Sequence, residues 1–254
     1  MLAATAMADT RVTDLTPSPY MFSTDQVGLR TLDAGTGFEA PDFVSGPISG
    51  QNGWTTFTAN MNAPVISTAN PASGAQHLRI TEGPGAGGSF NGAFSPNFGQ
   101  TAQNKRSITS VDIFHSDLDG ADANIVGQTP TDGLTSWRVV LNFEGGIFVL
   151  DDIGLGLQFV DTGVSWTPGE YKNLKVDFDP ANDAIDYYYD NALIYTGSVF
   201  GGTSVDQAIL FADNFFSFAP GSFIDYDNFS IIVPTPGALA LFGLAGLAGV
   251  RRRR

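Results

Sequence analysis

Apolar and polar residues alternate along several stretches of this chain, and this period of two predicts β-strands. In SWRVVLNF, every second residue from Trp137 to Phe143 is apolar. In YKNLKVDFD, the same holds from Leu174 to Phe178. Each of these strands therefore has one face suited to a hydrophobic core and one face suited to water.

The second stretch opens a predicted three-strand meander. A turn at 179–183 leads to AIDYYY, and a turn at Asp190 and Asn191 leads to ALIYTG. Other strands are predicted at 75–81, 107–114, 146–150, 155–161, 207–213 and 223–232. A long surface loop, or a pair of loops, is predicted over residues 83–104, which are rich in Gly, Asn and Gln. No amphipathic helix is predicted before Pro234.

The composition supports an all-β class. The 30 glycines and 14 prolines disfavour helices, whereas the 20 phenylalanines and 7 tyrosines suit a pleated, half-buried surface. About a dozen strands without helices make either a two-sheet antiparallel sandwich or a barrel.

Two sequence patterns favour one sandwich. GFEAPDFVSGPISGQNGW resembles the entry segment of LamG-like, concanavalin A-like jelly rolls, while VDFDPANDAIDYYYDNALIYTG and DYDNFSI resemble their late strands. The resemblance implies a jelly-roll domain over 37–232, after an N-terminal segment at 9–36. Glycan hydrolases and binding modules share this fold, so any activity has to be argued from a site.

The charge of the chain limits its partners. The formal net charge is −14, and four of the 12 basic residues are the terminal arginines, which leaves 8 bases against 26 acids in the rest. Such a surface repels phosphate groups, so we expect no nucleic acid partner. The chain has no cysteine, which excludes disulfides, a thiolate nucleophile and cysteine-ligated metals.

The last 22 residues, 233–254, form a tail of unusual composition. Fourteen uncharged residues, 237–250, separate a Pro-Thr-Pro motif from four arginines. As a short hydrophobic helix this segment covers about 21 Å, which is less than the ~30 Å of a bilayer core. Three glycines also weaken it as a helix of the domain core. A permanent membrane span and a core helix are therefore both disfavoured.

This order of motif, apolar segment and basic cluster resembles the PEP-CTERM sorting signal of bacterial exported proteins. In that family an exosortase, which is an intramembrane cysteine protease, cuts near a Pro-Glu-Pro motif. The resemblance implies that the enzyme recognises the first three of the following residues and that the arginines retain the tail in the membrane until processing: Pro234, Thr235, Pro236, Arg251, Arg252, Arg253 and Arg254. Thr235 departs from the glutamate that is usual in the family.

The N-terminus fits the same export route. Ala6-Met7-Ala8 has the A-x-A pattern that precedes a secretory cleavage, although an Ala-rich terminus is an equal alternative when this segment is taken alone. With the sorting tail it predicts that residues 1–8 are the remnant of a signal peptide. The expected location is the cell surface or extracellular matrix, with transient anchoring in the inner membrane through the tail.

No catalytic constellation is visible in the sequence. Glucanases of this fold place paired carboxylates on one strand, and no two of the four glutamates alternate in this way. Asp225 and Asp227 share a strand face, where hydrogen bonding or cation binding is a better interpretation than catalysis. His77 is interpreted as structural, and His115 has no Gly-x-Ser-x-Gly serine to serve.

A calcium site is one interpretation of the acidic stretch DLDGADAN. It places Asp117, Asp119, Asp122 and Asn124 within eight residues around a glycine. Calcium takes six to eight oxygen ligands of this kind. A solvated turn between strands is the alternative and is favoured over the metal site, because the spacing fits an EF-hand loop poorly.

Aromatic residues supply candidate platforms for sugar rings, which have an apolar face and a polar rim. The candidates are Trp54, Trp166, Tyr187 and Tyr189, with Tyr188 between the last two, and Asn52, Asp186 and Asn191 are polar neighbours. The alternative for each aromatic residue is packing in the core of the sandwich.

These features predict a secreted, non-catalytic module that binds extracellular polysaccharide. The first alternative is a polysaccharide hydrolase or lyase with an Asp-based site. The second is a purely structural surface protein without a ligand.

Overall fold

The computed structural model describes residues 34–58, 62–81, 90–97, 105–118, 120–130, 132–213 and 221–233. These residues form β-strands and two 3-10 helices, η2 (Gln51–Gly53) and η3 (Pro180–Asn182). No helix among them is long and apolar enough to cross a membrane. The predicted signal-peptide remnant and the sorting tail from Pro234 onward lie outside the described residues.

One sheet has nine strands. Eight follow the order β14-β13-β12-β7-β16-β5-β4-β2, and β1 pairs with β16. The strands are β1 (Ala34–Thr36), β2 (Gly46–Pro47), β4 (Val65–Ser67), β5 (His77–Thr81), β7 (Ser107–His115), β12 (Lys172–Asp179), β13 (Ala184–Tyr189), β14 (Ala192–Gly197) and β16 (Phe223–Ile232).

The other sheet has seven strands in the order β11-β10-β9-β8-β15-β6-β3. They are β3 (Thr55–Thr58), β6 (Asn91–Phe94), β8 (Asp122–Thr129), β9 (Leu134–Leu141), β10 (Gly146–Asp152), β11 (Leu157–Ser165) and β15 (Gln207–Asp213). All pairings in both sheets are antiparallel.

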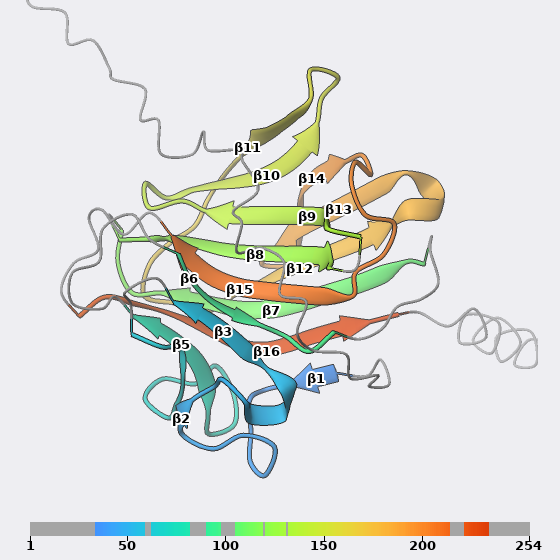
Figure 1. Ribbon diagram of the computed structural model, residues 1–254. Helices are drawn as coiled ribbons and strands as arrows, with labels where there is room; N and C mark the ends of the chain where they lie inside the picture. Colours follow the sequence, from blue (N-terminus) through green and yellow to red (C-terminus); the bar gives the residue numbers. More distant parts are fainter. Residues whose placement is uncertain are drawn as a thin grey trace, which may run out of the picture.

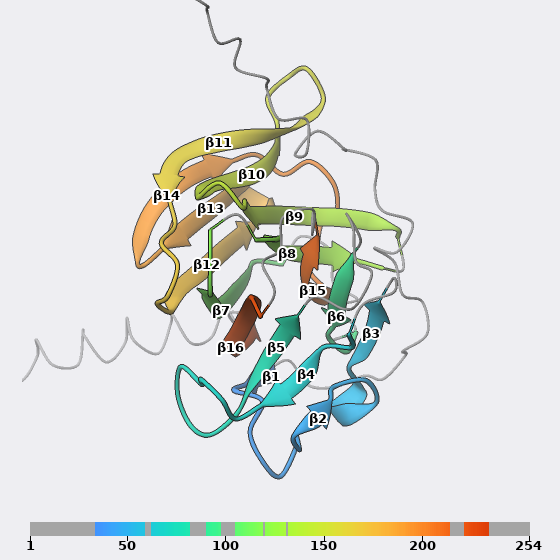
Figure 2. The same ribbon diagram turned by 90° about the vertical axis from the view of Figure 1, so that its left-hand side faces the viewer.

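The two sheets pack face to face and enclose one large core (Figure 1). In Figure 2, β12, β13 and β14 lie to the left, and β8, β15, β6 and β3 lie to the right. The inward residues of both sheets fill the space between them, as in Trp137, Val139 and Leu141 of β9. The prediction of an all-β, two-sheet antiparallel sandwich is confirmed.

Several strands lie where the sequence predicts them. Those predicted at 207–213 and 223–232 have these bounds in the structure. Two predictions are wrong. Strand β8 begins at Asp122, inside the stretch interpreted as a loop, and β6 lies within the loop predicted over 83–104. Every residue of β8 and β6 is buried, so neither strand shows the alternation by which a half-exposed strand is recognised.

A close approach in the core explains one glycine of β8. A Cβ at Gly127 would lie 2.4 Å from the Trp137 indole, closer than two such atoms can pack. Gly127 therefore provides the space into which the neighbouring strand places its largest side chain.

The hairpin between β10 and β11 projects from the body in both views (Figures 1 and 2). Asp152 Oδ1 accepts hydrogen bonds from the Gly154 and Gly156 amides and so shapes its tip. The tip presents Leu155, which is 83% exposed. This side chain makes little contribution to the core.

Candidate functional site

The four aromatic residues predicted as sugar platforms are core residues. Trp54, Trp166, Tyr187 and Tyr189 are between 0 and 8% exposed. Their prediction as ligand-binding residues is therefore corrected, because a ring enclosed on both faces by protein has no face left for a sugar.

Local packing shows why these rings point inward. Trp54 lies 5.4 Å from the Phe38 ring and 5.6 Å from the Phe229 ring, measured between centroids. Trp166 stacks on His115 at 4.6 Å, and its indole N–H donates to the Asn142 carbonyl at 2.7 Å. These contacts join the two sheets.

One of the polar neighbours of those rings, Asn191, lies in a turn. Asn191 is exposed and occupies a left-handed turn position between β13 and β14, with φ of 67°. Tyr188 points to the opposite face from its two neighbours, and Lys175 Nζ lies 3.9 Å above its ring centroid. The structure therefore does not bring Asn191 together with the predicted aromatic platforms.

The acidic residues predicted to bind calcium have separate partners. Asp117 Oδ2 accepts hydrogen bonds from the Ser116 and Ser222 hydroxyls, which hold the pKa of this carboxyl below its usual range. Asp122 Oδ1 accepts from the Phe143 amide. Asp119 lies outside the described residues. Among the residues that are described, no group of three or more His, Asp or Glu side chains is arranged to hold a metal.

Asn124 and Asp122 instead lie on the outer face of the seven-stranded sheet, beside an arginine. Arg138 Nε and Nη2 donate to Asn124 Oδ1 at 3.0 and 2.8 Å, and Nη2 lies 3.3 Å from Asp213 Oδ2. Asn124 Nδ2 donates to Asp213 Oδ1 at 2.8 Å. The amide thus bridges the ion pair from β8, between the arginine of β9 and the aspartate of β15.

Two aromatic rings flank this arginine. Its guanidinium carbon lies 5.0 Å from the Phe159 centroid and 5.2 Å from the Phe211 centroid. The side chains of Arg138 and Asp213 are 15 and 24% exposed, so the ion pair reaches the surface. We call the group formed by the partly exposed Arg138, Phe159 and Asp213, together with the buried Asn124 and Phe211 that contact Arg138, the Arg138 surface.

Burial perturbs both charged groups of the Arg138 surface. Loss of water raises the pKa of Asp213 above its usual range, although Arg138 and Asn124 oppose the shift. The same loss of water lowers the pKa of Arg138, while Asp213 and Asp122 oppose that change. Perturbed groups of this kind gather at functional sites more often than elsewhere.

A second network lies on the outer face of the nine-stranded sheet. Arg79 donates to both carboxylate oxygens of Asp225 at 2.7 Å, and its guanidinium carbon lies 3.7 Å from the Phe223 centroid. His77 Nε2 lies 3.1 Å from Asp225 Oδ1 without the geometry of a hydrogen bond. His77 is completely buried, which agrees with its interpretation as a structural residue.

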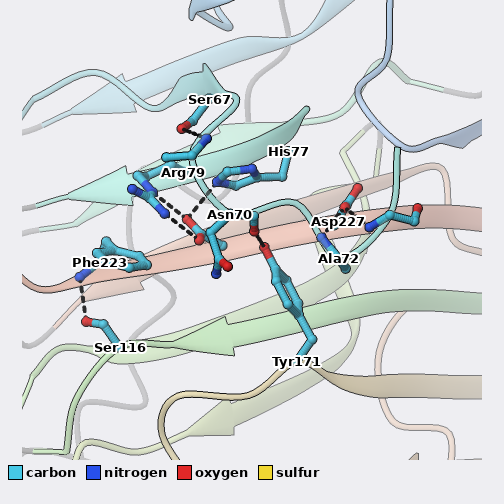
Figure 3. Close-up of polar contacts among 12 residues, drawn as sticks. Ser67, Asn70, Ala72, His77, Arg79, Ser116, Tyr171, Phe223 and Asp227 are labelled. Carbon is cyan, nitrogen blue, oxygen red and sulfur yellow. Dashed lines mark hydrogen bonds and ion pairs between the residues drawn. The ribbon is translucent and has the colours of Figure 1, made fainter. Parts of the chain in front are cut away.

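The loop between β4 and β5 is fastened over this network (Figure 3). Asp227 Oδ2 accepts from the Ala72 and Ser73 amides, and the Tyr171 hydroxyl donates to the Asn70 carbonyl. Burial raises the pKa of both Asp227 and Tyr171. Both carboxylates therefore make the hydrogen bonds that one of their two sequence interpretations describes.

His115 is likewise enclosed. Its Nε2 lies 2.7 Å from the Ala121 carbonyl, one face of its ring stacks on Trp166, and burial lowers its pKa. No serine hydroxyl is hydrogen-bonded to either ring nitrogen in the described residues.

Sequence reasoning missed the Arg138 surface. Arg138 and Asp213 are 75 residues apart, and only the register of β9, β8 and β15 brings them together. One signal was present, because Arg138 is the single base in a strand whose other central residues are apolar.

No protein family and no curated protein matches this chain by sequence. Several solved structures match by fold. A sialidase matches with a TM-score of 0.60 and 11% identity over 82% of this chain, and the match spans 19% of the sialidase. A carbohydrate esterase from the Shiga toxin-encoding bacteriophage phi24B matches with a TM-score of 0.53 and 12% identity, over 82% of this chain and 100% of the esterase.

A third match is the cellulose induced protein Cip1, with a TM-score of 0.51 and 11% identity, over 74% of this chain and 96% of Cip1. At such low identity these similarities concern the fold alone. By its fold, this chain is an antiparallel jelly-roll sandwich.

Proposed function

We propose that this protein is a non-catalytic carbohydrate-binding module that binds glycan at the Arg138 surface. The observation that carries the proposal is the position of a partly exposed Arg138–Asp213 pair beside the partly exposed Phe159 ring. Sugar recognition combines an aromatic or aliphatic contact for the apolar ring face with fixed polar groups for the hydroxyls. Here Arg138 and Asp213 are held rigid by their hydrogen bonds to the buried Asn124.

The similar folds support this proposal at the level of architecture. The names of the sialidase, the carbohydrate esterase and the cellulose induced protein all refer to carbohydrate. Fold alone does not fix function. The charged and aromatic groups of the Arg138 surface therefore supply the specific support.

The proposal includes the export route. Pro234, Thr235 and Pro236, followed by an apolar segment and four arginines, support processing by an exosortase-type protease, after secretion of the domain. The working protein would then be found at the cell surface or in extracellular polysaccharide.

A polysaccharide hydrolase is the second candidate, and one observation favours it. Asp122 and Asp213 are directly opposite each other on β8 and β15, both on the outer face. Opposite residues of adjacent strands have Cβ atoms about 5 Å apart, and retaining glycosidases hold their two carboxylates about 5 Å apart. Burial also raises the pKa of Asp213, as a general acid requires.

A glycan array probed with the wild-type protein, Arg138→Gln and Arg106→Gln tests the function. Arg106 is a matched control because its ion pair with Asp177 lies on the other sheet. We expect saturable binding that Arg106→Gln retains and Arg138→Gln weakens at least about tenfold, or ~1.4 kcal/mol. Circular dichroism checks that the variants fold, and Phe159→Ala tests the same surface without breaking the ion pair.

The other outcomes decide between the alternatives. If Arg138→Gln and Phe159→Ala bind glycan as tightly as the wild type, the ligand does not bind at the Arg138 surface. Release of reducing ends from a bound polysaccharide, lost in Asp213→Asn, would establish the hydrolase instead. If neither glycan binding nor product release is observed, the remaining alternative is a structural surface protein without a ligand.

A further inference from the structure

We infer that the glycan bound at the Arg138 surface carries no acidic groups and is bound more tightly when it carries amines. This inference rests on the proposed function, since it names the class of glycan for the same surface. It follows from the charges that the seven-stranded sheet presents.

The strands of this sheet are poor in cations. The seven of them contain one basic residue, Arg138, and five acids, Asp122, Asp151, Asp152, Asp161 and Asp213. Asp151 points inward and accepts hydrogen bonds from Tyr195 and Ser198. The other four lie on the outer face with Arg138, so this face has an excess of negative charge.

The single cation is already engaged by protein groups. Two nitrogens of Arg138 donate to Asn124, and one of them also contacts Asp213. Recognition of a sugar carboxylate commonly uses two parallel N–H donors of one arginine. To supply them, Arg138 would have to leave the partly buried carboxylate of Asp213 without its ion-pair partner, which is costly.

The outward acids favour the opposite charge on the ligand. Asp161 is exposed on β11, directly opposite Phe148 of β10, and Asp152 follows on the same face of β10. Each uses one carboxylate oxygen to accept a nearby backbone amide, from Gly154 for Asp152 and from Gly163 for Asp161, and both side chains lie at the surface. An ammonium group on a sugar gains attraction from these acids and from Asp213, whereas a carboxylate or sulfate is repelled.

The other described cations lie on the nine-stranded sheet or next to it, and they include Lys105 and also Lys175, whose Nζ lies 3.9 Å from the Tyr188 ring centroid. Arg79 is paired with Asp225, Arg106 with Asp177, and Lys172 with Glu170 and Asp190. All of them belong to the other sheet or its edge. The net charge of −14 adds a general repulsion toward polyanions.

Four matched polymers added to the glycan array test the inference. Hydroxyethylcellulose and carboxymethylcellulose share a backbone but differ in charge, and glycol chitin and glycol chitosan differ in their free amines. In about 0.15 M salt, where charges are screened beyond ~8 Å, we expect carboxymethylcellulose to bind at least about tenfold more weakly than hydroxyethylcellulose. We expect glycol chitosan to bind several-fold more tightly than glycol chitin, and Asp213→Asn to reduce that preference.

The possible results distinguish a failure of this inference from a failure of the proposed carbohydrate-binding function. Array hits among acidic glycans, or carboxymethylcellulose binding as tightly as its neutral partner, would overturn the inference and leave carbohydrate binding intact. A preference for glycol chitosan that persists in Asp213→Asn and in Phe159→Ala would assign it to the overall charge and would also overturn it. No binding to any glycan or polymer would overturn the proposed function itself.

Discussion

Trp54→Ala is expected to lower the free energy of unfolding by about 3–5 kcal/mol, the usual cost of removing a large aromatic side chain from a core. Trp54 is 1% exposed and packs against Phe38 and Phe229, so no neighbouring side chain fills the space it would leave. Urea denaturation followed by circular dichroism measures the change.

Leu155→Ala is the control for this substitution. Leu155 is exposed at the hairpin tip, and its truncation should change the free energy of unfolding by no more than about 0.5 kcal/mol. A Trp54→Ala variant as stable as Leu155→Ala, but unable to bind glycan, would reinstate the tryptophan as a ligand platform and contradict its assignment to the core.

Arg79→Ala is expected to cost about 3–5 kcal/mol, because it leaves the carboxylate of Asp225 buried without its partner. Asp225 is fully buried and receives two hydrogen bonds from Arg79, whose own side chain is 16% exposed. The contact of the guanidinium with the Phe223 ring is lost as well. The same urea titration measures the effect.

Arg106→Ala removes the same type of hydrogen-bonded pair from an exposed position. Arg106 is 46% exposed and donates to both oxygens of Asp177. An ion pair in water contributes only about 0–1 kcal/mol. If Arg79→Ala and Arg106→Ala lower the free energy of unfolding by the same small amount, burial of Asp225 is not what makes its ion pair important for stability.

The alternation of apolar and polar residues predicted the strands that have one face in the core and one face toward solvent. Leu174, Val176 and Phe178 of β12 are buried, and the polar residues between them are only half-buried. The pattern fails for β8, which is covered on both faces, and Asp122 and Asn124 there have the composition of a loop. A strand with two buried faces differs from a loop only in its neighbours, which the local sequence does not contain.

The burial of some aromatic residues could be predicted from the sequence, and that of others could not. In β13, Tyr187 and Tyr189 lie inward and Tyr188 lies outward. The alternation itself separates Tyr188 from the other two, and Ile185 on the same face as Tyr187 identifies the inward set. That signal is local and was available in the sequence, whereas Trp54 stands in an irregular segment that carries no such period.

The Arg138 surface could be recognised only once the fold was known. Its members come from β8, β9, β11 and β15, and the order of these strands in the sheet is not their order in the chain. Residues such as Asp213 and Asn124 become neighbours only after the register of β8 and β15 is fixed. The proposed export signal differs, because it is contiguous and is inferred from the sequence alone.

The pairing of β1 with β16 determines where a tether at either end would attach to the domain. Ala34 lies opposite Ile231, so the chain enters and leaves the nine-stranded sheet at neighbouring points. The Arg138 surface belongs to the outer face of the other sheet. A tether attached through either end would therefore join the sandwich at the nine-stranded sheet and not at the sheet that carries the proposed glycan-binding surface.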